Sequence, residues 1–210
     1  SALTGIGASA LVLPARPVWA EARSTLTRAS RGTVSSCDTA AVMTSEIAPR
    51  LSTPADFELA GTCRLTPDTV EGPYFICDGF ASQRDVTGGK PGEPMALALR
   101  VVDPTCTPIP GAIVDAWGCD AEGWYSGHTV GPDAPNATPR AERGNSRVPD
   151  TPERFLRGVL ATDADGIAEF DMIYPGFYGQ RTIHTHYKVH IGNQVFLTAQ
   201  ALFPEEFTRG

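Results

Sequence analysis

Two histidines one residue apart are the first feature of this chain that could do chemistry. His184 and His186 flank Thr185 where a strand is expected to begin. Residues i and i+2 of a strand point to the same side of the sheet, so the two imidazoles would lie side by side. Two neutral imidazoles can hold one metal ion. The alternative is a polar sheet face, of which His190 would be a further member.

Oxygen donors near the histidine pair are tyrosines. Tyr178 follows a Pro-Gly turn shortly before His184, and Tyr125 comes just after an expected strand. No carboxylate lies near the pair in sequence, as a 2-His-1-carboxylate Fe(II) site would need. A phenol with a pKa of about 10 becomes a ligand when a strongly Lewis-acidic ion ionises it. Two Tyr and two His therefore predict one mononuclear, non-haem Fe(III) ion.

Composition limits the possible fold classes and binding partners. The chain has 210 residues, of which 21 are Gly and 18 are Pro, and this argues against a helix bundle and for short elements joined by turns. A hydrophobic fraction of 41% is enough for a core. The formal net charge of −7 makes nucleic acid a poor partner, because phosphate binding needs a basic face.

The N-terminus has the character of a targeting segment. Residues 1–20 combine an apolar, small-residue run with Pro14, Pro17 and an Ala-ending site, and we interpret them as the remnant of an export signal. The run is too short and too broken by proline to span a bilayer. We therefore expect an exported protein, periplasmic or extracellular. An ordinary N-terminal tail is the alternative.

Five cysteines fit an oxidising compartment if two pairs form. They are Cys37, Cys63, Cys77, Cys106 and Cys119. A bond between Cys106 and Cys119 is disfavoured, because the expected strand between them separates the two sulfurs beyond disulfide reach. Simple buried thiols are the alternative.

Strand patterns are concentrated in the C-terminal part of the chain. We expect residues 21–62 to be a linker or wrapping arm, and residues 63–210 to form one domain. Three pairs of apolar runs are interpreted as hairpins: 95–103 with 112–120, 155–163 with 166–174, and 185–192 with 195–203. The fold class that follows is all-β, an antiparallel β-sandwich with an irregular N-terminal arm.

Several separated sequence blocks carry a resemblance to a known family. The blocks are Thr69–Phe75, Gly111 through Trp117 to Tyr125, and Pro175–Tyr178 through Arg181 to His186. In this order and spacing the chain resembles the intradiol ring-cleavage dioxygenases, the family of protocatechuate 3,4-dioxygenase and catechol 1,2-dioxygenase. The resemblance covers roughly residues 63–204. It implies a prealbumin-like β-sandwich.

The resemblance also implies roles for single residues. The iron ligands would be Tyr125, Tyr178, His184 and His186. Tyr178 would be the tyrosinate that leaves the metal when substrate binds, while Tyr125 would remain.

Further roles concern the substrate. Arg181 would stabilise negative charge on the bound substrate, and Gln200 would line the site beside it. Tyr74 and Pro73 would help to wall the substrate pocket.

The implied activity is cleavage of a catechol-type ring between its two hydroxylated carbons with O2, giving a cis,cis-muconate-type diacid. Two alternatives stay open: an exported, non-catalytic β-sandwich binding module, and a metal-binding family member without turnover. The expected partners are a catechol-type substrate and O2, with no membrane span and no nucleic acid. The choice between a monomer and a homo-oligomer is left open.

Overall fold

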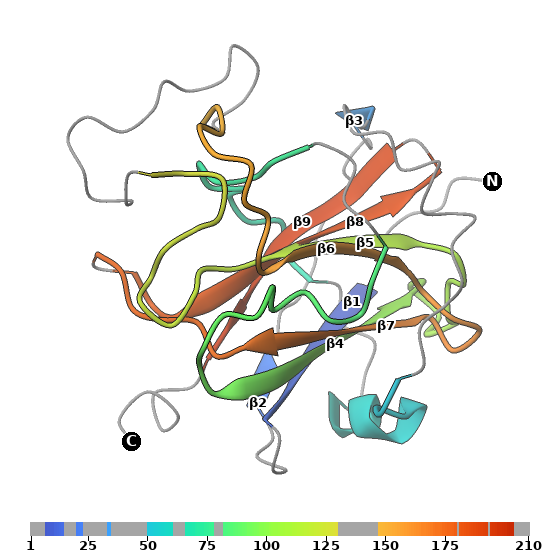
Figure 1. Cartoon of the computed structure of the whole chain (residues 1–210). Coiled ribbons are helices and arrows are strands. Elements are labelled where there is room, and N and C mark those ends of the chain that lie inside the picture. Colours follow the sequence, from blue (N-terminus) through green and yellow to red (C-terminus); the bar gives the residue numbers. More distant parts are fainter. Residues whose placement is uncertain are drawn as a thin grey trace.

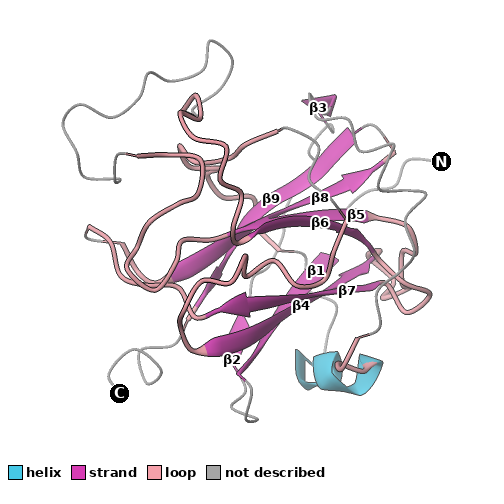
Figure 2. Cartoon of the chain, viewed as in Figure 1, coloured by secondary structure: helices cyan, strands magenta, loops and turns pink. Residues whose placement is uncertain are grey.

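Two antiparallel sheets lie face to face and form a β-sandwich (Figures 1 and 2). The computed structural model describes residues 7–14, 20–22, 33–34, 50–60, 66–77, 82–129, 147–179, 181–192 and 194–203. One sheet has the strand order β2-β1-β4-β7, and the other has the order β3-β9-β8-β5-β6. The prediction of an all-β, antiparallel sandwich is confirmed.

The strands and the 3₁₀ helix η2 have the following bounds: β1 Gly7–Pro14, β2 Ala20–Ala22, β3 Thr33–Val34, η2 Pro54–Ala60, β4 Pro94–Val102, β5 Ile113–Trp117, β6 Arg157–Ala161, β7 Ile167–Ile173, β8 His184–Ile191 and β9 Gln194–Leu202. Among the described residues, no helix has the length and apolar character needed to cross a membrane.

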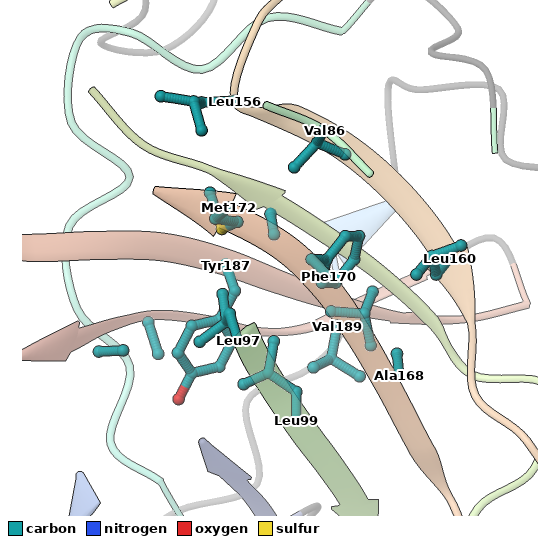
Figure 3. Packing of buried hydrophobic residues seen from close by; sticks show 14 of the residues in the cluster. Val86, Leu97, Leu99, Leu156, Leu160, Ala168, Phe170, Met172, Tyr187 and Val189 are labelled. Carbon is teal, nitrogen blue, oxygen red and sulfur yellow. The ribbon is translucent and has the colours of Figure 1, made fainter. Parts of the chain in front are cut away.

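The main core lies between the sheets. Leu97 and Leu99 from β4 and Phe170 from β7 are fully buried against Tyr187 and Val189 from β8 (Figure 3). Apolar side chains at every second position of β4 and β8 face this core, as strand geometry requires. Burial of these side chains is the main stabilising contribution to the sandwich.

Strand β8 is buried on both faces. Its odd-numbered residues Tyr187 and Val189 enter the main core, so His184, His186 and Lys188 point to the outer face of the five-stranded sheet. These outward side chains are nevertheless buried. The outer face therefore has its own cover, and the candidate site lies beneath it.

Two of the three expected hairpins are wrong. β4 pairs with β1 and β7, whereas β5 pairs with β6 and β8, so the connection after β4 crosses from one sheet to the other. β6 and β7 are likewise in different sheets. Alternation of apolar residues predicts strands but not their partners, and a short turn can join two sheets as well as two neighbouring strands. The third hairpin, β8 with β9, is confirmed.

Parts of the N-terminal region contact the sandwich. Residues 7–14 form β1 alongside β4. Further along, Arg50 forms ion pairs with Asp163 and Asp165, and the amide of Ser52 donates to Glu169 at 2.7 Å. Pairing of β1 in a chain that retains these residues does not test cleavage, so the export signal stays a prediction. Most of the expected 21–62 arm lies outside the described residues.

The three cysteines in the described part of the chain are of two kinds. Cys77 and Cys106 each take part in a disulfide, whereas Cys119 is a buried free thiol. This excludes a bond between Cys106 and Cys119, as the strand geometry indicated. Cys37 and Cys63 lie outside the described residues.

Candidate metal centre

Four side-chain donors from three parts of the chain meet at one point on the outer face of the five-stranded sheet. The Nε2 atoms of His184 and His186 are 3.0 Å apart, and Tyr178 Oη lies 2.9 Å from Nε2 of His184. Tyr125 Oη lies 3.1 Å from Tyr178 Oη. The structure thus brings together all four residues that were expected to bind a metal.

The two imidazoles are held in different ways. His184 Nδ1 lies 2.6 Å from the carbonyl oxygen of Thr182, to which it donates, so its Nε2 carries the lone pair. His186 Nδ1 has no hydrogen-bond partner among the described residues. Its ring is instead stacked on the indole of Trp117, with centroids 4.9 Å apart and an interplanar angle of 6°. Both Nε2 atoms therefore face the same point.

Burial keeps both imidazoles neutral. It lowers the pKa of His184, and the nearby Arg181 guanidinium lowers it further. Burial also lowers the pKa of His186 well below its ordinary value, with His184 and Arg181 adding to the effect. A neutral imidazole is the form that binds a metal ion.

A phenol, unlike an imidazole, must lose its proton to bind a metal ion. Burial raises the pKa of Tyr125 well above its ordinary value, and the neighbouring Tyr178 raises it further. Without a cation at this point Tyr125 would stay protonated. A phenolate here needs a strongly Lewis-acidic ion. Strong Lewis acidity distinguishes Fe(III) from softer or less acidic metal ions.

The distribution of carboxylates also favours phenols as the oxygen donors. Among the described His, Cys, Asp and Glu side chains, no three gather as a metal-binding group. The oxygen donors beside the histidine pair are the two phenols. The residues present therefore fit a ferric ion held by two Tyr and two His.

The two tyrosines differ in exposure. Tyr125 is buried and its ring is stacked on Tyr74, with centroids 4.5 Å apart. Tyr178 is half-buried and meets Tyr125 edge to face, at 5.6 Å. Tyr125 is thus fixed from behind, while Tyr178 stands on the open side of the site.

A segment that we call the strap, residues 66–77, covers the outer face. The amide of Thr69 donates to the carbonyl oxygen of Thr198 at 2.8 Å, and Lys188 forms an ion pair with Glu71. A Cβ atom on Gly72 would fall 3.1 Å from Cε1 of His186, so the strap passes directly over this ring. The strap therefore covers the His186 side of the candidate site.

Two predicted substrate residues, Tyr74 and Pro73, belong to the strap. Tyr74 is buried behind Tyr125, and its hydroxyl accepts a hydrogen bond from Arg147 Nη1 at 3.2 Å. The carbonyl oxygen of Pro73 accepts from the amide of Arg147 at 2.6 Å. Tyr74 contacts Tyr125, Arg147 and His128, whose ring meets it edge to face at 5.0 Å.

Arg181 and Gln200, predicted to act on the substrate, contact each other. Arg181 Nη2 donates to Gln200 Oε1 at 2.8 Å, and Gln200 Nε2 donates to the carbonyl oxygen of Val70 at 3.0 Å. Gln200 is the cross-strand partner of His186 on β9. This places the Arg181 guanidinium at the exposed edge of the site, tied to the strap through one amide.

The two turns that carry the tyrosines are packed together. A Cβ atom on Gly176 would fall 2.7 Å from the amide nitrogen of Gly123, and one on Gly123 would fall 2.7 Å from the carbonyl oxygen of Phe177. Neither contact leaves room for a side chain. Each glycine stands two residues before one of the two tyrosines, so these contacts help to set the spacing of Tyr125 and Tyr178.

Sequence reasoning missed the role of the residues behind the ligands. Trp117 was named only as part of a sequence block that carries the resemblance, yet its indole stacks directly on His186. Its register opposite His186 was the missing information, and this depends on the pairing of β5 with β8. Lys188, whose ion pair holds the strap, stands two residues after His186, and that spacing on a strand was a signal that could have found it.

Comparison with known proteins identifies the family of this chain. A family model described as Dioxygenase (Dioxygenase_C) matches residues 70–206. This range contains β4 to β9, the strap from Val70 onward and all four donor residues. The family match covers more than half of the chain. The chain belongs to the intradiol ring-cleavage dioxygenase family.

Individual relatives extend this result. Catechol 1,2-dioxygenase from Pseudomonas sp. (strain EST1001) is 30% identical over 145 residues, which cover 64% of this chain and 46% of the relative. Catechol 1,2-dioxygenase 1 from Acinetobacter lwoffii is 26% identical over 158 residues, which cover 64% of this chain and 45% of the relative. The chain thus spans less than half the length of these curated relatives.

Among solved structures, an intradiol ring-cleavage dioxygenase from Tetranychus urticae superposes with a TM-score of 0.62 at 34% sequence identity. The match covers 70% of this chain and 68% of that chain.

Proposed function

We propose that the protein is an Fe(III)-dependent intradiol dioxygenase. It would cleave a catechol-type ring between its two hydroxylated carbons with O2 and release a cis,cis-muconate-type diacid. The observation that carries this proposal is the convergence of Tyr125, Tyr178, His184 and His186 within hydrogen-bond distance of one another. Fe(III) held there would supply the Lewis acidity that ionises phenols and makes a chelated catecholate reactive towards O2.

Exposure assigns different roles to the two tyrosines. Tyr178 is half-buried and stands on the open side, so it is the ligand that can leave and accept a proton from a substrate hydroxyl. Tyr125 is buried between Tyr74 and Tyr178 and stays in place. This difference supports the roles that the family resemblance implied.

Arg181 supplies positive charge at the edge of the site. Its guanidinium would face negative charge that develops on the ring during cleavage, and Gln200 holds it by a 2.8 Å hydrogen bond. The strap and the aromatic side chains beneath it exclude water on the other side, which strengthens such charge pairing. Arg181 and Gln200 thus act as a unit.

Export is a second part of the proposal. Disulfides at Cys77 and Cys106 are consistent with an oxidising compartment, because such bonds form and persist outside the cytosol. Release of the mature protein into the periplasm or medium, tested by N-terminal sequencing of the secreted form, would support it. Retention in the cytosol would overturn it.

The test of the activity is oxygen uptake by iron-loaded protein with a panel of small catechols. We expect about one iron per chain, a visible tyrosinate-to-iron absorption band, and a change of that band on adding a catechol. An iron-free, colourless protein after reconstitution would overturn the proposal and favour a non-catalytic module. Iron and colour without oxygen uptake would instead identify a metal-binding family member without turnover.

A further inference from the structure

Asp120 is a buried carboxylate between β5 and the ligand Tyr125. Its Oδ1 atom accepts hydrogen bonds from the amides of Glu122, at 3.1 Å, and Trp124, at 2.9 Å. Its Oδ2 atom lies 3.0 Å from Nζ of Lys90, with which it forms an ion pair. The side chain therefore closes the turn that ends at Tyr125 and anchors it to the loop before β4.

The main chain of Asp120 contacts both tyrosine-bearing turns. Its carbonyl oxygen accepts from the amide of Gly123 at 3.0 Å and from the amide of Gly176 at 2.8 Å. Gly176 belongs to the turn that presents Tyr178. One residue thus joins the turn before Tyr125 to the turn before Tyr178.

We propose that Asp120 is a positioning residue of the metal centre. By fixing the 120–124 turn it aims its own carbonyl oxygen at Gly176, and so it holds the Tyr125 and Tyr178 hydroxyls at their separation of 3.1 Å. Asp120 does not contact the donor atoms. The identity of the metal rests on the proposed function, but the coupling of the two turns does not.

The chain supplies a matched control for this role. Asp103 accepts hydrogen bonds from the amides of Thr105, at 2.8 Å, and Thr107, at 2.9 Å, through its Oδ1 atom. This is the same spacing, two and four residues ahead, that Asp120 uses. Asp103 closes the turn after β4, and this turn carries neither Tyr125 nor Tyr178. Replacement of Asp103 therefore measures the effect of losing a turn of this type without any effect on the two tyrosines.

The first experiment needs no metal. Amide hydrogen exchange is measured on the metal-free, full-length protein with Asp120→Ala and Asp103→Ala. We expect Asp120→Ala to speed exchange by about tenfold in both 120–125 and 175–178, because charge-assisted hydrogen bonds are lost. Asp103→Ala should speed exchange in its own turn alone. Unchanged exchange in 175–178 of Asp120→Ala would overturn the proposal.

A second variant covers the case in which Asp120→Ala does not fold. Asp120→Asn keeps an acceptor at Oδ1 but loses the charge that strengthens these bonds and pairs with Lys90. It should still raise exchange several-fold in both turns. Exchange equal to the wild type in both turns would overturn the proposal.

The last experiment uses the iron-loaded protein. We expect iron retention against a chelator and the visible band to be greatest in the wild type, intermediate in Asp120→Asn and lowest in Asp120→Ala, with Asp103→Ala like the wild type. A folded Asp120→Ala variant with wild-type iron retention and band would overturn the role at the metal. A wild type that binds no iron would overturn the proposed function instead, and exchange alone would then decide on Asp120.

Discussion

The indole of Trp117 lies parallel to the imidazole of His186, with ring centroids 4.9 Å apart. The two residues are direct cross-strand partners on β5 and β8, so the strand register produces the stack. His186 Nδ1 has no hydrogen-bond partner among the described residues, in contrast to Nδ1 of His184. Packing against Trp117, rather than a hydrogen bond to Nδ1, orients the His186 ring.

Replacement of Trp117 should therefore affect the metal as well as the fold. Trp117→Leu is expected to lower the free energy of unfolding by about 3 kcal/mol, because a large buried side chain is lost. It should weaken iron binding about 10–100-fold, as loss of an outer-shell support does. Chelator competition and urea unfolding measure the two effects. Trp124→Leu, at an exposed position, is the control and should change neither stability nor iron binding. Iron binding unaffected by Trp117→Leu would contradict a role of Trp117 in orienting His186.

Removal of one phenol should be visible directly. Tyr125→Phe deletes a donor atom and should weaken the visible band. It should also lower iron affinity by more than the roughly 10–100-fold that follows loss of a residue supporting a ligand. Tyr174→Phe is the matched control, because the buried Tyr174 hydroxyl has no hydrogen-bond partner among the described residues. Absorption spectra and iron analysis compare the two variants. A Tyr125→Phe spectrum identical to the wild type would exclude Tyr125 as a ligand.

Arg181 should matter for turnover and not for the metal. Arg181→Ala leaves the four donor atoms in place, so iron content and colour should persist while kcat falls by about 100-fold. Arg100→Ala, whose guanidinium contacts the carbonyl oxygen of Asp165 instead, is the control. Oxygen uptake and iron analysis on the same samples separate the two effects, and full activity of Arg181→Ala would show a purely structural role.

Gln200 should act through Arg181. Gln200→Ala removes the bridge between the guanidinium and the carbonyl oxygen of Val70, so the cation becomes mobile. We expect a fall in kcat of about tenfold, smaller than that of Arg181→Ala, and little further loss in the double variant. Steady-state kinetics test this. Additive losses in the double variant would mean that the two residues act separately.

His190 should make the fold sensitive to acid. Burial, with Lys188 nearby, lowers the pKa of His190 to about 4. The unfolded chain protonates this residue below about pH 6.5, whereas the folded chain does so below about pH 4, so stability falls as the pH drops through this window. Above it both states are neutral and no dependence is expected. The contribution lost at pH 5 is about 2 kcal/mol.

The variant His190→Leu tests this origin of acid sensitivity. Neither ring nitrogen of His190 has a hydrogen-bond partner among the described residues, so a leucine of similar size removes a titrating group without breaking a bond. Between pH 7 and pH 5 the variant should lose about 2 kcal/mol less stability than the wild type in urea unfolding. An equal loss in both proteins would assign the sensitivity to other groups.

The four proposed ligands were predicted from local sequence, whereas the residues that pack behind them were not. The spacing of His184 and His186 on a strand predicts their shared face, and the Pro-Gly turn places Tyr178 shortly before them. The stack of Trp117 on His186 required the pairing of β5 with β8, which lie far apart in sequence. The two wrong hairpins have the same cause, since strand partners depend on contacts between distant segments.

The strap would affect how the protein gains and loses a metal ion bound at this site. It lies over His186 and is held by Lys188 and by hydrogen bonds to β9. An ion that leaves on that side must wait for the strap to detach, which is a local opening and not global unfolding. Metal exchange by this route would then follow the opening rate of residues 66–77. Two proteins with the same four ligands and equal equilibrium affinity could, on this basis, load and release iron at different speeds.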